Sequence, residues 1–251
     1  MTQKEAVIQT LERLGGIATL GRLYQEVFKV RDCVWNTKTP FASIRRIVQL
    51  SNEIFKVRPG LWALESYRYK LESEGIIPSE RTNIEDEKYT HGYYQGLLIE
   101  LGRLQKYETF VPSQDKHRKC LNQELGLMTS ISEIPKFSYP YLVKKCSTID
   151  VSWFHRNESH LDVVMPIALF EVEHTTDIQN SLMKFSEMRW FNVKMCIVAD
   201  VRRRNEFESK MSINVFSDLK KHKKVEFISY DEVVEQYNRL VYKHPTFSLL
   251  I

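Results

Sequence analysis

A nearly all-apolar segment that ends in two acids constrains the fold of this 251-residue chain most strongly. The segment runs Val163-Val-Met-Pro-Ile-Ala-Leu-Phe-Glu-Val-Glu173. It is far shorter than the roughly 20 residues that span a bilayer, which favours a buried strand in a protein core over a membrane segment. Side chains alternate along a strand, so Glu171 and Glu173 share one face while Val172 points the other way. Two acids on one face of a buried strand are costly unless something neutralises them.

Other apolar patterns place this strand in an α/β domain. The predicted strands beside it are Thr148–Phe154, Val193–Val198 and Val225–Ser229. The clearest predicted helices are Tyr89–Tyr107, Asp177–Trp190 and Asp231–Tyr242. The order of these elements predicts a mixed central sheet that is flanked by helices.

The first 70 residues have the pattern of a smaller, separate module. Its predicted helices are Lys4–Leu14, Leu20–Lys29 with Thr19 as N-cap, and Pro40–Leu50 with Thr39 as N-cap. Two short predicted strands follow, Ile54–Val57 and Leu61–Leu64, joined by the turn Arg58-Pro59-Gly60. Three small helices followed by a hairpin is the order of a winged helix-turn-helix.

The charge distribution supports this division. Residues 1–70 hold 12 Lys and Arg against 6 Asp and Glu, whereas residues 71–88 hold 2 against 6. The other 163 residues hold 22 against 20 and are nearly neutral. We therefore expect a winged-helix domain over 1–69, an acidic linker over 70–88 and a second domain over 89–251. A basic module is compatible with a polyanionic partner, although many basic surfaces only aid solubility.

Three carboxylates are the candidate metal ligands. If the strand that carries Asp150 pairs with the next strand as a hairpin, Asp150, Glu171 and Glu173 converge on one point. Mg²⁺ is usually held by one or two carboxylates together with phosphate oxygens, and such a site suits the hydrolysis of a phosphodiester. The alternative is that these acids lie in solvent at strand ends, paired with lysines.

The order of these residues resembles the PD-(D/E)XK nuclease superfamily. The resemblance rests on Ile149-Asp150 at a strand and on Phe170-Glu-Val-Glu173 at the end of an apolar strand, followed by an amphipathic helix. It implies that Asp150 and Glu171 are metal ligands and that Glu100, on the first helix, assists them. Glu173 stands where the family usually has a lysine that positions or deprotonates the attacking water. Some restriction endonucleases of this superfamily carry Glu there, which implies a general base or second metal ligand.

The first module resembles the winged-helix module named HARE-HTH, which occurs in chromatin proteins and fused to restriction endonucleases. The matching motifs are Lys4-Glu-Ala-Val-Ile, Leu14-Gly-Gly, Thr37-Lys-Thr-Pro40, Ser43-Ile-Arg-Arg46 and Arg58-Pro-Gly-Leu-Trp62. The helix from Pro40 is then the recognition helix. Its expected DNA contacts are Lys38, Ser43, Arg45 and Arg46, with Lys56 and Arg58 on the wing. For each of these residues taken alone, a solvated surface role is the simpler alternative.

Together the resemblances imply a Mg²⁺-dependent type II restriction endonuclease that leaves 5′-phosphate ends. A homodimer would let two such sites cut both strands of double-stranded DNA. The rival hypothesis is a non-catalytic winged-helix DNA-binding protein that uses a degenerate nuclease fold as a dimerisation scaffold. The missing lysine motivates it. The basic run Arg202–Arg204 either clamps a DNA backbone or is solvated.

Several other classes of protein lack support in the sequence. The four cysteines have no CxxC spacing, which favours free thiols in a reducing cytoplasm over structural zinc. HxxxH and HExxH patterns are absent, which disfavours a zinc hydrolase. GxGxxG, P-loop and GxSxG motifs are also absent, so we expect no nucleotide cofactor and no serine chemistry. The N-terminus has no apolar signal core, so nothing predicts secretion.

Overall fold

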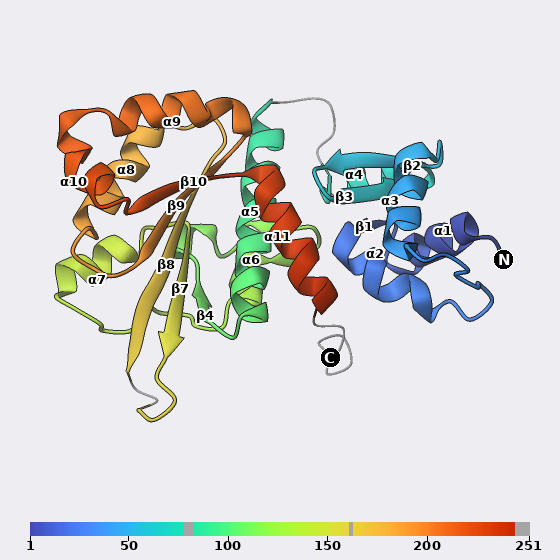
Figure 1. Cartoon of the computed structure of the whole chain (residues 1–251), viewed down its shortest axis with the longest axis horizontal. Coiled ribbons are helices and arrows are strands. Elements are labelled where there is room, and N and C mark those ends of the chain that lie inside the picture. The colour runs from blue at the N-terminus through green and yellow to red at the C-terminus, as the bar shows by residue number, and fades with distance from the viewer. Residues whose placement is uncertain (78–82, 161–162, 244–251) are drawn as a thin grey trace. The chain divides into compact units, whose positions relative to one another are not determined.

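The computed structural model describes residues 1–77, 83–160 and 163–243, and the chain forms two compact units (Figure 1). The first unit comprises Met1–Glu80 with Val234–Ile251, and the second comprises Arg81–Val233. No helix in the described ranges is long and apolar enough to cross a membrane.

The first unit combines helices with a small antiparallel sheet. Its elements are α1 (Gln3–Arg13), β1 (Ile17–Thr19), α2 (Leu20–Glu26), α3 (Pro40–Leu50), β2 (Ile54–Arg58), β3 (Leu61–Leu64) and α4 (Arg68–Ser73). The strand order is β1-β3-β2. Strands β2 and β3 and the turn at Gly60, where φ is +71°, lie where the apolar pattern predicts them, whereas β1 was not predicted. Three residues are too few to show a strand's alternation.

Capping explains two of the three predicted helix starts. Thr2 and Glu5 form a capping box at α1, and the Thr19 side chain accepts a hydrogen bond from the Arg22 backbone N–H. The predicted cap at Thr39 is wrong, because its side chain makes no capping bond. Its backbone, at φ −131° and ψ 65°, lies outside the extended conformation that aims a capping oxygen at the helix. Pro40 starts α3 nevertheless, since its φ is preset.

The stretch predicted as an acidic linker, 70–88, contains regular structure on both sides of residues 78–82, which lie outside the described residues. It includes most of α4, with the Leu71 side chain fully buried, and the start of α5 (Asn83–Leu104). The end of the chain also differs from the expected division, because α11 (Tyr230–Lys243) runs from the second unit into the first. There Asn238 Oδ1 accepts a hydrogen bond from the Gly21 backbone N–H at 2.9 Å.

The second unit is built on a mixed five-stranded sheet, which confirms the predicted sheet type. The strand order is β10-β9-β8-β7-β4. The strands are β4 (Glu108–Phe110), β7 (Val151–Arg156), β8 (Val164–Glu173), β9 (Lys194–Ala199) and β10 (Val225–Ser229). Strands β4, β7 and β8 run antiparallel to their neighbours in turn, and β8, β9 and β10 run parallel.

Helices cover both faces of this sheet, as Figure 1 shows. The face of Leu169 packs against α8 (Ile178–Glu187), with further contributions from α7 (Pro140–Cys146), α9 (Arg204–Met211) and α10 (Ser217–Lys221). On the other face, Trp153 contacts the Phe170 ring and donates from Nε1 to the Leu98 carbonyl of α5. Residues 168–173 of β8 are therefore all buried, which explains the continuous apolar run in the sequence.

Core packing in the second unit gives a stability prediction. Leu182 of α8 is fully buried, whereas its neighbour Met183 is 47% exposed. We expect Leu182→Ala to lower the free energy of unfolding by about 2–5 kcal/mol, through lost burial and a residual cavity. Met183→Ala, the matched control, should stay within roughly 0.5 kcal/mol. Urea unfolding followed by circular dichroism measures both, and equal effects would contradict this assignment of the core.

Candidate functional site

Pairing of β7 with β8 brings Asp150 next to Glu171. Val151 pairs with Phe170 in an antiparallel register, so Asp150, one residue earlier, stands opposite Glu171. The Val172 backbone N–H donates to Asp150 Oδ2 at 2.9 Å. Asp150, Glu171 and Glu173 are only 7%, 2% and 4% exposed. The strand-end alternative, with these acids in solvent, therefore does not describe this structure.

Helix α8 supplies polar partners to both glutamates. Ser181 and Lys184 are three residues apart and so lie on one side of the helix. Lys184 Nζ lies 2.8 Å from both carboxylate oxygens of Glu171 and donates to the Thr148 carbonyl at 3.1 Å. Ser181 Oγ lies 3.1 Å from Glu171 Oε2 and also contacts Glu173 Oε1. Thr176 Oγ1 donates to Glu173 Oε2.

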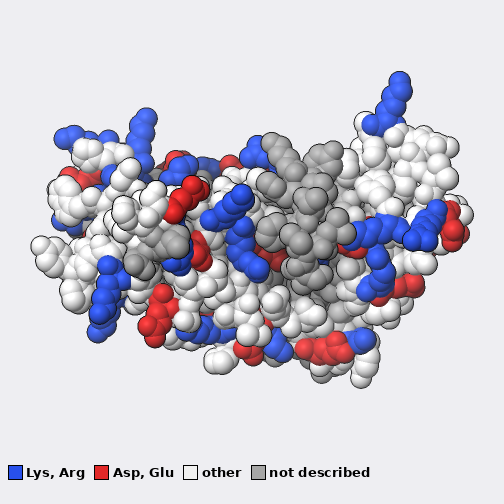
Figure 2. Space-filling view, turned by 90° about the horizontal axis from the view of Figure 1, so that it is seen from below, with Lys and Arg blue, Asp and Glu red and all other residues white. Residues whose placement is uncertain are grey.

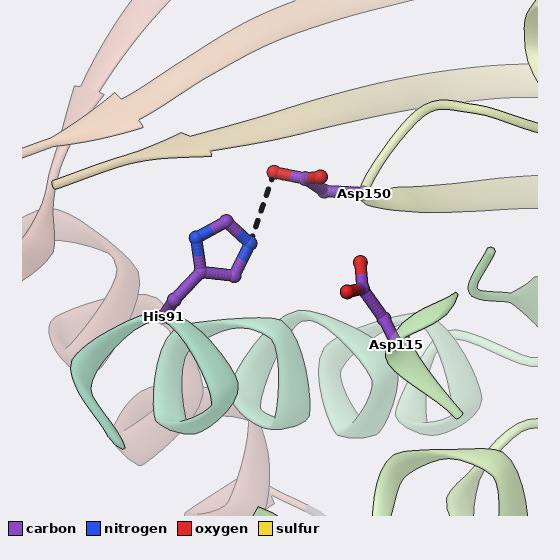
Figure 3. A group of neighbouring side chains, drawn as sticks. All are labelled: His91, Asp115 and Asp150. Carbon is purple, nitrogen blue, oxygen red and sulfur yellow. Dashed lines mark ion pairs between the residues drawn. The ribbon is translucent and has the colours of Figure 1, made fainter. Parts of the chain in front are cut away.

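Helix α5 approaches Asp150 with two side chains one turn apart. His91 Nε2 lies 3.2 Å from Asp150 Oδ2, and Figure 3 shows the ring directed at that carboxylate. Gln95 Nε2 donates to the Asp150 carbonyl at 3.1 Å and to Asp115 Oδ2 at 2.9 Å. Asp115 ends the short 3-10 helix Ser113–Asp115 and forms an ion pair with Arg118 at 2.8 Å.

The pKa values of Asp150 and Glu171 are shifted in opposite directions. Burial, followed by the nearby Asp150 charge, raises the pKa of Glu171 well above its ordinary value despite the Lys184 ammonium. Burial also acts to raise the pKa of Asp150, but the neighbouring His91 imidazole and the Val172 N–H outweigh it and lower that pKa. For Lys184, burial acts to lower the pKa, and the Glu171 carboxylate overcomes it and raises the pKa. Lys184 thus stays charged beside Glu171.

The charge balance at this point is suited to a bound cation. Three buried carboxylates meet the single ammonium of Lys184 and the imidazole of His91. The Ser181 hydroxyl has one proton and cannot donate to both glutamates at once. A divalent ion between Asp150 and Glu171 would compensate the remaining negative charge, so the residues present fit Mg²⁺.

The structure arranges the predicted site residues differently from the expected single point. Among the described residues, His91, Asp115 and Asp150 form the set of three ligand residues whose atoms all lie within 4.8 Å of one another, so Glu171 and Glu173 do not belong to that set. Glu173 is instead turned toward Thr176 and Ser181. Glu100 does not join the cluster either: it follows His91 by nine residues and points to about the opposite side of α5. There the charge of Glu100, together with burial as the larger cause, raises the pKa of the Cys120 thiol.

Sequence reasoning missed Lys184, His91 and Gln95. Lys184 lies on the predicted amphipathic helix, one turn from Ser181, but no spacing rule connects a helix position to a strand carboxylate. His91 and Gln95 are one turn apart on the predicted first helix, where the resemblance implies only an acid, Glu100. Two polar residues one turn apart on an otherwise buried helix face indicate a polar site, and this pattern could have identified His91 and Gln95.

The basic residues predicted to contact DNA differ in exposure. Lys38, Arg45, Arg46 and Lys56 are exposed, and Ser43 is half-buried on α3. The Arg45 guanidinium lies 3.3 Å from the Tyr24 hydroxyl. Arg58 is half-buried and donates to the Val57 carbonyl, so it is less available than a wing residue in open solvent. On the face shown in Figure 2, Lys and Arg side chains are interspersed with acidic ones among the described residues.

The basic run Arg202–Arg204 has structural partners within the second unit. Arg202 pairs with Asp200 at 2.8 Å. Arg203 pairs with Glu206 and donates to the carbonyls of His174 and Thr176. Arg203 therefore ties down the loop that follows Glu173, which is neither of the two roles expected for this run.

The raised pKa of Glu171 predicts how metal-free stability depends on pH. Stability contributed by protonated Glu171 is present below its ordinary pKa near ~4.3 and is lost as the pH rises toward the raised pKa of the folded state. Glu171→Gln keeps the shape but cannot ionise. In chelator at neutral pH it should raise the thermal unfolding midpoint above wild type, and the gain should vanish below about pH 4.

Glu208→Gln is the matched control, since Glu208 is an exposed acid on α9. Differential scanning calorimetry should find it equal to wild type at both pH values. A midpoint for Glu171→Gln below that of wild type at neutral pH would show that Lys184 fully compensates the buried charge.

The chain matches the model of a known protein family. The model of the family described as "Type II restriction enzyme NmeDI C-terminal domain" matches residues 76–245, which is more than half of the chain. The matched range contains Asp150, Glu171 and Glu173. No curated protein and no solved structure matches the chain.

Proposed function

The chain belongs to the type II restriction enzyme NmeDI C-terminal domain family, and from this premise we propose that it is a Mg²⁺-dependent, site-specific endonuclease of double-stranded DNA. The observation that carries the proposal is the buried set of Asp150 and Glu171, held beside the Lys184 ammonium. Burying these charges lowers folding stability when no cation is bound. A metal-dependent hydrolase needs such a cation for its reaction, and the bound ion would offset this loss of stability.

Asp150 and Glu171 are the proposed ligands of Mg²⁺. When bound, this ion would lower the pKa of a water molecule and stabilise negative charge on the phosphate that is attacked. Lys184 places a second positive charge at Glu171, although position 173 holds Glu where the resembling superfamily usually has lysine. In this proposal Lys184 of α8 supplies the ammonium group that the superfamily usually places at the position of Glu173.

Glu173 is the proposed general base. Its carboxylate accepts from Thr176 and Ser181, which fix its orientation. In the proposed reaction a water oxygen attacks phosphorus, the water proton passes to Glu173, and the bond from phosphorus to O3′ breaks. The products are a 5′-phosphate and a 3′-hydroxyl, the latter protonated from solvent. Glu100, on the far side of α5, has no part in this proposal.

The first unit is the proposed DNA-binding domain. Helices α1–α3 and the β1-β3-β2 sheet are arranged in the order expected of a winged helix, with α3 as the recognition helix. Exposed Lys38, Arg45 and Arg46 would meet the duplex, with Ser43 beside them and Lys56 reaching a phosphate. Half-buried Arg58 would contribute less. The proposed DNA-binding domain of residues 1–69 lies within the first unit, which comprises Met1–Glu80 with Val234–Ile251.

We further propose that the protein acts as a homodimer in the cytoplasm, without a nucleotide cofactor. Two active sites related by a two-fold axis would cut both strands of a palindromic sequence. The rival proposal of a non-catalytic DNA-binding protein is favoured by one observation: Glu173 replaces the usual lysine and is already engaged by Ser181 and Thr176.

Cleavage separates the two proposals. With Mg²⁺ and phage or plasmid DNA, wild type should produce discrete fragments whose sequenced ends report the site and the stagger. Asp150→Asn and Glu171→Gln should each lower the cleavage rate by at least about 100-fold, because each removes a proposed metal ligand. Glu208→Gln should cut at the wild-type rate. Undiminished cutting by both site variants would remove the proposed site, and absence of cutting by wild type would favour the non-catalytic protein.

DNA affinity tests the role of the first unit. Arg46→Ala and Lys56→Ala should each weaken binding, and each should reduce the slope of log K against log salt by about 0.9 if one phosphate contact is lost. Lys4→Ala is the matched control, since Lys4 is a basic residue of the same unit that pairs with Glu53. Fluorescence anisotropy in Ca²⁺, at several salt concentrations, measures the slopes. Equal losses in all three variants would indicate a general charge effect.

A further inference from the structure

Beside the Asp150–Glu171 pair lies a second set of ligand atoms, on the side that faces α5. His91 comes from α5, Asp115 from the 3-10 helix Ser113–Asp115, and Asp150 from the residue before β7. One ligand atom from each of the three residues lies within 4.8 Å of the other two. Figure 3 shows the side chains of His91 and Asp115 directed toward the same space as Asp150. Three separate elements thus converge on one small volume.

Buried polar atoms at this point lack hydrogen bonds. Gln95 is fully buried, and its Nε2 donates both to Asp115 Oδ2 and to the Asp150 carbonyl, which holds the amide between two members of the set. Within the described part of the chain, Gln95 Oε1 has no hydrogen-bond partner. His91 Nε2 approaches Asp150 at 3.2 Å but in a geometry that makes no hydrogen bond. A buried imidazole nitrogen normally has a partner in a folded protein, and a bound ion would provide one for His91 Nε2, which faces Asp150.

The chemistry of the donor set indicates the class of ion. It offers one imidazole nitrogen and two carboxylate oxygens. Imidazole suits transition metals such as Zn²⁺ and Fe²⁺, and carboxylate oxygens suit Mn²⁺, whereas Mg²⁺ prefers oxygen ligands alone. Arg118 pairs with Asp115 Oδ1 and Gln95 binds Oδ2, so the carboxylate is oriented by fixed neighbours, and each oxygen keeps a further lone pair for a metal.

We propose that His91, Asp115 and Asp150 form a second divalent-cation site, which takes a transition-metal ion and shares Asp150 with the Asp150–Glu171 pair. The Gln95 amide supports it from α5. Binding at this site does not depend on the proposed nuclease activity, because its ligands are in place without DNA. Asp150 then connects two ions of different preference, one with oxygen ligands and one with a nitrogen ligand.

Pulsed EPR of Mn²⁺ bound to the full, tag-free chain tests this site directly. At about one Mn²⁺ per chain and without DNA, wild type should show ¹⁴N coupling from a directly bound imidazole. His91→Gln should lose the ¹⁴N coupling and bind Mn²⁺ more weakly, on the order of tenfold or more. His117→Gln is the matched control, since His117 is an exposed histidine that contacts Glu124, and it should keep both properties.

Two further variants make the result independent of folding and of catalysis. Asp115→Asn preserves side-chain volume and should weaken Mn²⁺ binding by a similar factor. Glu171→Gln should keep the ¹⁴N coupling, because Glu171 does not belong to the second site, even where it abolishes cleavage. Absence of ¹⁴N coupling in wild type, or coupling that survives in His91→Gln, would overturn the second site. Failure of the nuclease proposal would appear only in the cleavage assay.

Discussion

Burial of three carboxylates at one end of a sheet is the constraint on which the rest of the second unit depends. Glu171 and Glu173 lie on one face of a strand whose neighbours are apolar on both sides, so water cannot solvate them. The raised pKa of Glu171 expresses this cost. Lys184 compensates part of the charge from α8, and the rest is the electrostatic reason to expect a cation.

Helices α8 and α5, which cover the two faces of the sheet, determine which side chains reach Asp150, Glu171 and Glu173. Helix α8 lies on the face of Glu171 and supplies Ser181 and Lys184. Helix α5 lies on the other face and supplies His91 and Gln95 to Asp150 at the strand end. Asp150 is therefore the residue at which the environments of the two faces meet. This position explains how one carboxylate can belong both to an oxygen-rich pair and to a mixed nitrogen and oxygen set.

Much of the fold could be predicted because its signals are local. The strand ending at Glu173 and the helix after Asp177 follow from apolar runs and alternation, and α3 starts at a proline. Strand β1 was missed because three residues carry no period. The cap at Thr39 failed because residue preference does not specify the backbone dihedrals that a cap needs.

The sequence by itself determined that two acids would share one face at the end of an apolar strand, and it brought Asp150 to Glu171 only on the condition that the two strands pair as a hairpin. These features depend on alternation and on neighbouring strands. Only the tertiary structure decided that Lys184, and not a residue of the strand, faces Glu171, and that His91 and Gln95 occupy the place expected for Glu100. The physical reason is that the rotation and docking of α5 and α8 on the sheet are set by packing between residues distant in the chain, and a turn of about 180° around a helix moves a side chain to the opposite side.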